Sequence, residues 1–342
     1  MTTIIIEASD NITTALNNLC NTTQSHITLA VINKQIIAGA IGPEFYKLYN
    51  TGCTADVEDF AIRIPTRVMK TVCSSICEIR IDIDTGIKLL KMKDGGVLMG
   101  VTVPLEQDFN LDMIIQTIAD GKNSSEPLDI SAVSDLRPLV AYADSGLQCT
   151  DGLAYVIGSG FTAYRKINSK LSFIMTKDNI SEFVKFANAH NNIELFESGI
   201  YTVFFCGGHY FGCKQPRSFV ESDYSSYTSS KPLYSVPLNL SEFCYVLRAI
   251  GIPKGESPKC NFDLEHFVVR MDLGSRGRYA IAIGIKDAEP VSGKNASFKI
   301  LTESLKRVFS GSSLKFDAIT LVVYKSFIAF KIGENDFLFV KE

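Results

Sequence analysis

Apolar and polar residues alternate over short runs along most of the chain, which is the two-residue period of a β-strand with one buried face. These runs are rich in Ile, Val, Tyr and Phe, the residues that strands favour. Glycine pairs such as Gly207-Gly208 separate some of them and predict tight turns. The clearest predicted strands cover residues 26–32, 78–83, 200–205, 279–285 and 319–324.

Helical spacing of apolar residues is confined to short segments of about 8–14 residues. The predicted helices cover residues 11–19, 65–76, 130–143, 177–189, 240–249 and 301–309. Short helices scattered among many strands do not give the strict alternation of strand and helix that builds a parallel sheet. The pattern therefore predicts an α+β fold.

A helix-plus-strand pattern recurs along the chain. Three segments, starting at Phe60, Leu171 and Ala296, share the order strand, short amphipathic helix, strand, strand, turn, strand. A similar half that begins with a helix precedes each of them. We therefore predict three pseudo-repeated domains, each built of two helix-plus-antiparallel-sheet halves. The predicted domains cover 1–122, 123–230 and 231–342, with junctions rich in Ser, Lys and Pro at 121–127 and 225–232.

Length and charge narrow the possible functions. The chain has 342 residues, of which 46% are hydrophobic and 21% charged, as in an ordinary folded protein. Its formal net charge of −3 excludes a protein coated in positive charge but leaves room for a local basic lining. No run approaches the roughly 18–20 apolar residues of a membrane helix, so no membrane partner is expected.

Nine cysteines at irregular spacings argue against a disulfide framework. The first residues lack the basic segment and apolar run of a secretory signal. Reduced thiols in a cytoplasm are therefore expected.

Two short motifs resemble cofactor or metal sites. Residues 158–163 spell G-x-G-x-x-A after a predicted strand, as in a dinucleotide-binding turn, but a turn and strand rather than a helix follow. Cys206, His209 and Cys213 have metal-like spacing, but no second Cys/His pair lies nearby in sequence. A hairpin around Gly207-Gly208 is the plainer interpretation of the second motif.

Neither paired carboxylates nor catalytic sequence motifs favour an enzyme active site. Asp82 and Asp84 share one face of a predicted strand and could hold a divalent ion, although solvent-facing strands commonly carry such charges. The four histidines do not cluster, and no nucleophile elbow or phosphate-cradling loop occurs. We predict that the protein is not an enzyme and uses no cofactor or metal.

Three motifs stand in a fixed order along the repeats. Residues 64–70 read IPTRVMK, residues 217–224 read RSFVESDY, and the last half-domain starts at 298–309 and ends with DFLFV at 336–340. Together they resemble the I-P-x-K-x-L-K opening, the R-L-I-E-G-x-F-P-D-Y element and the last half-domain of the bacterial-type DNA polymerase sliding clamp, the β processivity factor. The resemblance covers essentially the whole chain, by pattern more than by identity.

This resemblance implies a DNA-clamp fold that forms a ring as a homodimer. Three similar domains placed head to tail leave a free sheet edge at each end, and ring closure removes both edges. The implied function is a processivity factor that encircles duplex DNA and tethers a replicative polymerase, with no catalysis of its own. The implied partners are double-stranded DNA bound without sequence preference, a DNA polymerase that binds through a short linear peptide, a clamp loader and a second copy.

Basic residues on the short helices are candidates for a DNA lining, because phosphate contacts need only Lys and Arg. Ordinary solvated helix faces are the alternative interpretation. The candidates are Arg67, Lys70, Arg137, Lys177, Lys185, Arg248, Lys306 and Arg307.

The resemblance also implies a pocket for a partner peptide between the second and third domains. Its candidate residues, carried over position by position, are Gly160, Ala163, Ser222, Ser226, Tyr227, Phe327, Ala329, Leu338 and Val340. Alternatively, Phe327, Leu338 and Val340 are simply core strand residues. The family commonly has Pro and Arg where this chain has Ser222 and Ser226.

The chain departs from the family pattern at two places that form this pocket. Residues 158–163 read GSGFTA where the family has T-D-G-H-R-L, and the tail reads VKE where the family has an M-P-M-R-like end. These departures bear on the specificity of the pocket. They also suggest a phage or mobile-element origin, which would place the protein in the host cytoplasm.

Two other functions stay open. One is a clamp-fold interaction protein, a decoy or transcription tether, that binds a partner peptide without encircling DNA productively. The other is an unrelated β-rich structural protein whose repeats mimic the clamp pattern, for which higher oligomers are expected.

Overall fold

The computed structural model describes residues 3–7, 10–21, 24–72, 76–82, 86–93, 96–103, 106–108, 110–123, 125–128, 130–189, 192–215, 229–252, 257–294, 296–311, 319–333 and 335–340. By backbone contacts the chain divides into two compact units. Unit 1 comprises Met1–Leu128 with Ser181–Gln215, and unit 2 comprises Asp129–Ile180 with Pro216–Glu342.

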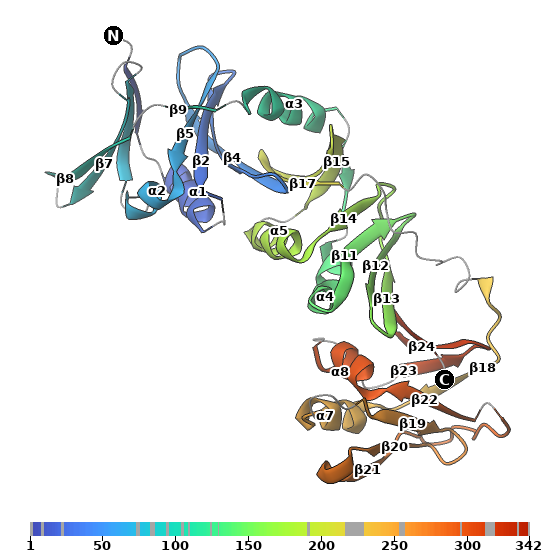
Figure 1. Cartoon of the computed structure of the whole chain (residues 1–342). Coiled ribbons are helices and arrows are strands. Elements are labelled where there is room, and N and C mark those ends of the chain that lie inside the picture. The colour runs from blue at the N-terminus through green and yellow to red at the C-terminus, as the bar shows by residue number, and fades with distance from the viewer. Residues whose placement is uncertain are drawn as a thin grey trace. The chain divides into compact units, whose positions relative to one another are not determined.

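Six segments of the chain share one order of elements: strand, helix, and three further strands (Figure 1). We call each a half-unit. The first two are β1 (Thr3–Glu7), α1 (Asp10–Cys20), β2 (His26–Ile32), β3 (Gln35–Ile41), β4 (Phe45–Thr54), and β5 (Phe60–Pro65), α2 (Thr66–Val72), β6 (Ile76–Asp82), β7 (Gly86–Lys93), β8 (Gly96–Val103). The next two are β10 (Glu126–Pro127), α4 (Ile130–Val140), β11 (Ala143–Thr150), β12 (Leu153–Gly158), β13 (Phe161–Lys166), and β14 (Phe173–Met175), α5 (Lys177–Ala189), β15 (Glu194–Ser198), β16 (Tyr201–Cys206), β17 (His209–Lys214). The last two are β18 (Tyr234–Leu238), α7 (Ser241–Ala249), β19 (Lys259–Asp263), β20 (Val268–Asp272), β21 (Arg278–Ala282), and β22 (Ser297–Leu301), α8 (Thr302–Gly311), β23 (Ile319–Val323), β24 (Phe327–Ile332), β25 (Asn335–Val340).

Consecutive half-units exchange their first strands, and all the pairings are antiparallel. β1 pairs with β6 of the next half-unit, and β5 pairs back with β2. The same exchange joins β10 to β15 and β14 to β11, and then β18 to β23 and β22 to β19. The exchange groups the six half-units into three pairs, so the predicted α+β fold of repeated halves is confirmed.

The last strands of the half-units join neighbouring pairs. β4 pairs with β17, which makes the nine-stranded sheet β10-β15-β16-β17-β4-β3-β2-β5-β9 in unit 1, where β9 is Glu106–Gln107. In the same way β13 pairs with β25, which makes the eight-stranded sheet β14-β11-β12-β13-β25-β24-β23-β18 in unit 2. The two four-stranded sheets, β1-β6-β7-β8 and β21-β20-β19-β22, end on the last strands β8 and β21.

The nine-stranded sheet is covered on both faces, which explains why β2 is buried along almost its whole length. On one face α1 packs against β3 and β4, and Phe183 and Phe186 of α5 contact Phe211. On the other face Ile114 of α3 (Leu111–Gly121) joins a cluster with Tyr46 and other strand residues.

A cluster of phenylalanines forms the core of unit 2 and holds its two sheets to its helices. Phe243 of α7 contacts Phe262 of β19 and Phe309 of α8. Phe330 of β24 in turn contacts both Phe262 and Phe309. α7 and α8 lie side by side against these strands (Figure 1). The four-stranded sheet β21-β20-β19-β22, called the edge sheet below, buries only its helix-facing side. Residues along β19 and β20 therefore alternate between buried and solvent-facing.

The predicted elements correspond closely to the observed ones. A helix is present at each of the six predicted places, but Ile76 and Ala143, the predicted ends of two of them, are instead the first residues of β6 and β11. The three segments that start at Phe60, Leu171 and Ala296 are the second, fourth and sixth half-units. Sequence analysis missed α3, which belongs to no half-unit and packs on the face of the nine-stranded sheet that α1 and α5 leave open. The predicted strand at 279–285 ends earlier, at Ala282. The exact domain boundaries stay a prediction.

Candidate functional site

A cavity of about 120 Å³ lies in unit 2 where the β12–β13 turn meets β24 and β25. Its walls are apolar except for the Thr162 hydroxyl and the main chain, so it suits a small apolar side chain rather than a charged group. The lining residues are Gly158, Gly160, Phe161, Thr162, Phe327, Leu338 and Phe339.

Two glycines shape the rim of this cavity. Gly160 has a φ of 80°, a left-handed conformation that L side chains rarely adopt. A Cβ at Gly160 would also lie 2.6 Å from Oγ of Ser304 on α8. The Ser304 hydroxyl donates to the carbonyl oxygen of Ser159 at 3.2 Å, which ties α8 to the turn. A Cβ at Gly158 would meet the Phe161 ring at 2.5 Å, so both positions require glycine.

Aromatic side chains extend the apolar surface beside the cavity. The rings of Phe327 and Tyr324 stack with their centroids 4.2 Å apart. Tyr164 packs against the same cluster, and its hydroxyl donates to Oδ2 of Asp336 at 2.5 Å. Burial and the neighbouring Asp336 carboxylate raise the pKa of Tyr324, so its phenol stays neutral at ordinary pH. The Tyr324 phenol therefore adds no charge to this surface.

The structure brings three of the predicted pocket residues, Gly160, Phe327 and Leu338, together around the cavity. Ala329 pairs with Leu338 and belongs to the adjacent cluster. Ala163 pairs with Phe337 rather than Leu338, so its side chain is on the opposite face of the sheet from Thr162 and Leu338.

The structure describes only the backbone pairing of one of the remaining predicted pocket residues, and three others lie outside the described ranges. The backbone of Val340 pairs with Phe327 at the end of β25. Ser222, Ser226 and Tyr227 lie outside the described residues. Sequence analysis missed Gly158, Phe161, Thr162 and Phe339 as lining residues. The first three stand in the 158–163 motif itself, whereas alternation places the Phe339 side chain on the opposite face from Leu338, so no side-chain pattern marks Phe339 as a lining residue.

Six of the eight basic candidates are exposed on helix surfaces. They are Arg67 and Lys70 on α2, Arg137 on α4, Lys177 and Lys185 on α5, and Arg248 on α7.

The two candidates on α8 are half-buried and have protein partners. Lys306 donates to the backbone carbonyl of Ile250, which fixes its ammonium group at the end of α7. Arg307 pairs with Glu303 at 2.5 Å and lies over the Tyr142 ring, 5.6 Å from its centroid. Such a guanidinium still has free N–H groups for a phosphate, because a single carboxylate oxygen accepts one of its five donors.

The motifs that resembled cofactor and metal sites occupy hairpins. Residues 159 and 160 form the tight turn between β12 and β13, and no helix follows it. Cys206 pairs with His209 across the predicted β16–β17 hairpin, which is confirmed. Within the described ranges, no group of three His, Cys, Asp or Glu side chains is arranged to hold a metal ion. Asp84 lies outside these ranges.

Solved structures of bacterial polymerase clamps match this arrangement over the full chain. A putative DNA polymerase III β subunit from Eubacterium rectale aligns with a TM-score of 0.72 at 11% identity, covering 99% of this chain and 98% of its own. The β subunit from DNA polymerase of Streptococcus pyogenes aligns with a TM-score of 0.70 at 12% identity over 100% of both chains. The chain has the sliding-clamp fold.

Another match with the clamp fold has a peptide bound. The Helicobacter pylori β clamp, solved with a DNA ligase peptide, aligns with a TM-score of 0.67 at 13% identity over 100% of this chain and 99% of its own. No protein-family model matches the chain, and no curated protein matches it by sequence. The clamp fold is therefore visible in the arrangement of elements and only faintly in residue identity. Among the described helices, none is long and apolar enough to cross a bilayer.

Proposed function

We propose that the protein is a DNA sliding clamp: a non-enzymatic ring that encircles duplex DNA and tethers a replicative polymerase. Confinement on DNA turns polymerase dissociation into a local event that is quickly reversed, because the tethered enzyme stays at high effective concentration. The proposal places the protein in the cytoplasm, where a clamp loader would open the ring.

The observation that carries the proposal is how the last strand of each half-unit is paired. Two of the three pairings that a closed ring needs are made inside the chain, β4 with β17 and β13 with β25. The remaining last strands, β8 and β21, end their sheets among the described strands. By the same rule, β21 of one copy would pair with β8 of a second copy. Two such pairings close a homodimer of six domains and remove both open edges.

The exposed basic residues on the helices supply what a mobile ring needs. Arg67, Arg137 and Arg248 can each contact a phosphate without reading a base. Few such contacts are needed, since tight binding would stop the ring from sliding.

The cavity beside β13 and β25 is proposed as the docking site of the polymerase. An apolar anchor from a linear peptide would enter between Thr162, Phe327 and Leu338. The peptide bound to the Helicobacter pylori clamp supports this mode of binding for the fold.

Retention on DNA of different topology tests the proposal. The protein is loaded on nicked circular duplex DNA with a clamp loader, passed over a sizing column, and then the circle is cut once with a restriction enzyme. A sliding ring stays on the circle and leaves the linear product through its ends. Release from both DNAs alike, together with normal binding of an apolar peptide, would instead establish the decoy or tether function.

A further inference from the structure

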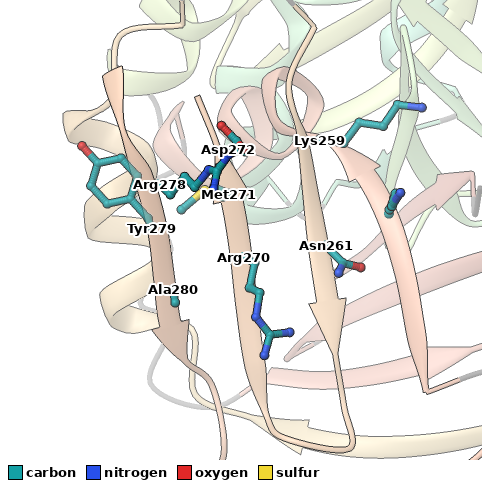
Figure 2. A pocket seen from close by; sticks show the side chains of 9 residues that line it. Lys259, Asn261, Arg270, Met271, Asp272, Arg278, Tyr279 and Ala280 are labelled. Atoms are coloured by element: carbon teal, nitrogen blue, oxygen red, sulfur yellow. Dashed lines mark hydrogen bonds and ion pairs between the residues drawn. The ribbon is translucent and has the colours of Figure 1, made fainter. Parts of the chain in front are cut away.

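A groove of about 500 Å³ crosses the solvent face of the edge sheet β21-β20-β19-β22 in unit 2 (Figure 2). This face points away from the phenylalanine core. The residues that alternate with its side chains along each strand, such as Phe262 and Val269, are buried on the other face. The volume is within the range of small-ligand sites, about 300–1,000 Å³. The groove is separate from the cavity beside β13 and β25, and its lining includes none of the residues assigned above to DNA or peptide binding.

The strand register places four cationic residues of the groove in two neighbouring rows. Lys299, Asn261, Arg270 and Ala280 face one another across the four strands. Lys259 and Arg278 stand two residues away along β19 and β21, on the same face. Within a row the cations are about 10 Å apart, two strand spacings, and the rows are separated by about 7 Å. Ala280 keeps the groove open beside Arg270, as Figure 2 shows.

The polar groups of the groove are mostly hydrogen-bond donors. Ser297 donates to Oδ1 of Asn261 at 3.0 Å, which leaves the Asn261 NH₂ group to donate into the groove. Arg270 bonds Asp263 at 2.6 Å and Arg278 bonds Asp272 at 2.8 Å, so each guanidinium is held in place with other N–H groups still available. Lys299 has no ion-pair partner among the described residues.

Charge makes this face unlike the rest of the molecule. The outward positions of the four strands carry four cations against two carboxylates, Asp263 and Asp272, whereas the whole chain has a formal charge of −3. A local excess of positive charge in an acidic protein attracts a polyanion. Lys, Arg and Asn are also residue types that commonly contact nucleic-acid phosphates.

We propose that this groove binds a single strand of nucleic acid through its phosphodiester backbone. The strand would run across the sheet, with successive phosphates near Lys299 and Lys259 and then near Arg270 and Arg278. An acidic peptide would meet the same cations, but the Asn261 amide and the guanidinium groups of Arg270 and Arg278 together form a donor set that commonly binds phosphate oxygens, which is why the nucleic acid is preferred.

This inference goes beyond the proposed clamp function and does not depend on ring closure. A protein held on duplex DNA would have single-stranded template or displaced strand within reach, so even a weak site would be occupied. The site would therefore serve as a second nucleic-acid contact, distinct from the helix surfaces that face the duplex.

Fluorescence anisotropy of a labelled oligo-dT of about 20 nucleotides tests the proposal across a salt series. Lys259→Ala/Lys299→Ala is expected to weaken binding at least tenfold and to reduce the salt slope by about 1.4, since two phosphate contacts are lost. The matched control is Lys286→Ala/Lys294→Ala, which removes two exposed lysines outside the groove and is expected to leave binding unchanged.

Three outcomes would overturn the proposal. The first is absence of oligo-dT binding by the wild-type chain, and the second is equal weakening by the two double-lysine variants. The third is equally strong competition by a poly-glutamate peptide, which would assign the groove to an acidic protein segment. Retention on circular duplex DNA, measured in parallel, should be unaffected by Lys259→Ala/Lys299→Ala. The two readouts thereby distinguish failure of the proposed single-strand site from failure of the proposed clamp function.

Discussion

Lys47 on β4 and Glu182 on α5 form an ion pair that is almost closed to water, with 2.5 Å between Nζ and Oε2 and side chains that are 2% and 8% exposed. Lys185 also donates to Glu182, at 2.7 Å. Burial alone would raise the pKa of Glu182, but hydrogen bonds from Lys185 and Lys47 hold it below its ordinary value. Burial lowers the pKa of Lys47, and Glu182 offsets part of that effect. The pair joins the first half-unit to the fourth within unit 1.

Removing one partner of this pair should cost far more than removing both. We expect Glu182→Leu to lower the free energy of unfolding by about 3–5 kcal/mol, because it leaves the Lys47 ammonium buried without its carboxylate. Lys47→Met should cost less, since Glu182 keeps Lys185. The double variant Lys47→Met/Glu182→Leu should recover most of the loss. Urea denaturation of the three variants measures this, and simple additivity would contradict it.

Substitution of two residues of β21, an open edge strand, by lysine should prevent formation of the dimer. Tyr279→Lys/Ala280→Lys places charge on an edge strand, a common way in which natural sheets prevent strand pairing. Light scattering over a dilution series should then report a species near 37.7 kDa instead of twice that mass. The control Ile200→Lys/Leu233→Lys alters two exposed apolar residues outside β8, β21 and α7, the helix that packs on β21, and should leave the dimer intact. A wild-type monomer would refute closure by strand pairing.

A bulky side chain at Thr162 should block the peptide cavity without disturbing the core. Thr162 lines the cavity and is only half-buried, so Thr162→Phe fills space that the peptide anchor would occupy. We expect at least tenfold weaker binding of a fluorescent peptide with Leu and Phe anchors, at an unchanged melting temperature. Ser235→Phe, on the exposed surface of β18 in the same sheet, is the matched control. Unaltered peptide affinity in Thr162→Phe would place the docking site elsewhere.

Loss of basic residues on the helices should reduce the salt dependence of the affinity of the ring for circular DNA. Arg137→Ala/Arg248→Ala removes two exposed candidates and should reduce the slope of log affinity against log salt by about 1.8. Lys286→Ala/Lys294→Ala removes the same charge away from the helices and should leave the slope unchanged. Equal slopes for all three proteins would favour the alternative of ordinary solvated helix faces.

Asp263 should contribute to stability only above strongly acidic pH. Its hydrogen bond from Arg270, with a further contribution from His266, holds the pKa of this carboxyl at about 2. A carboxyl whose pKa is depressed by folding stabilises the protein above its unfolded pKa of about 3.9, and that stability is lost as the pH falls toward 2. Asp263→Asn should therefore cost about 1 kcal/mol at neutral pH and make unfolding less pH-dependent between about 4 and 2. Chemical denaturation at several pH values measures both effects.

Local periodicity explains which elements could be predicted. Residues 26–32 were predicted as a strand and form β2 with the same bounds, and residues 177–189 were predicted as a helix and form α5. Each element has an apolar pattern of its own that marks it without reference to the rest of the chain. The α3 segment was missed because it stands outside the repeat on which the prediction relied, and only the open face of the nine-stranded sheet gives its apolar side a partner.

The candidate sites depended on contacts between residues far apart in sequence. The resemblance named Gly160 and Leu338 together, but register across β13 and β25 decided that Thr162 faces the cavity and Ala163 does not. A shift of one residue in that pairing would exchange their faces. The groove on the edge sheet was not foreseen, since Lys259, Arg270 and Lys299 lie on three strands separated by loops.

The sequence by itself determined the α+β class, the repeated order of strand and helix, and the residue types available for DNA and peptide binding. Those features follow from local spacing, which a chain carries wherever it folds. Only the tertiary structure decided which strands are exchanged between half-units, that β8 and β21 are the open last strands, and which side chains share a cavity. These outcomes rest on long-range pairing, where the burial of whole sheet faces selects one register among many that local pattern allows.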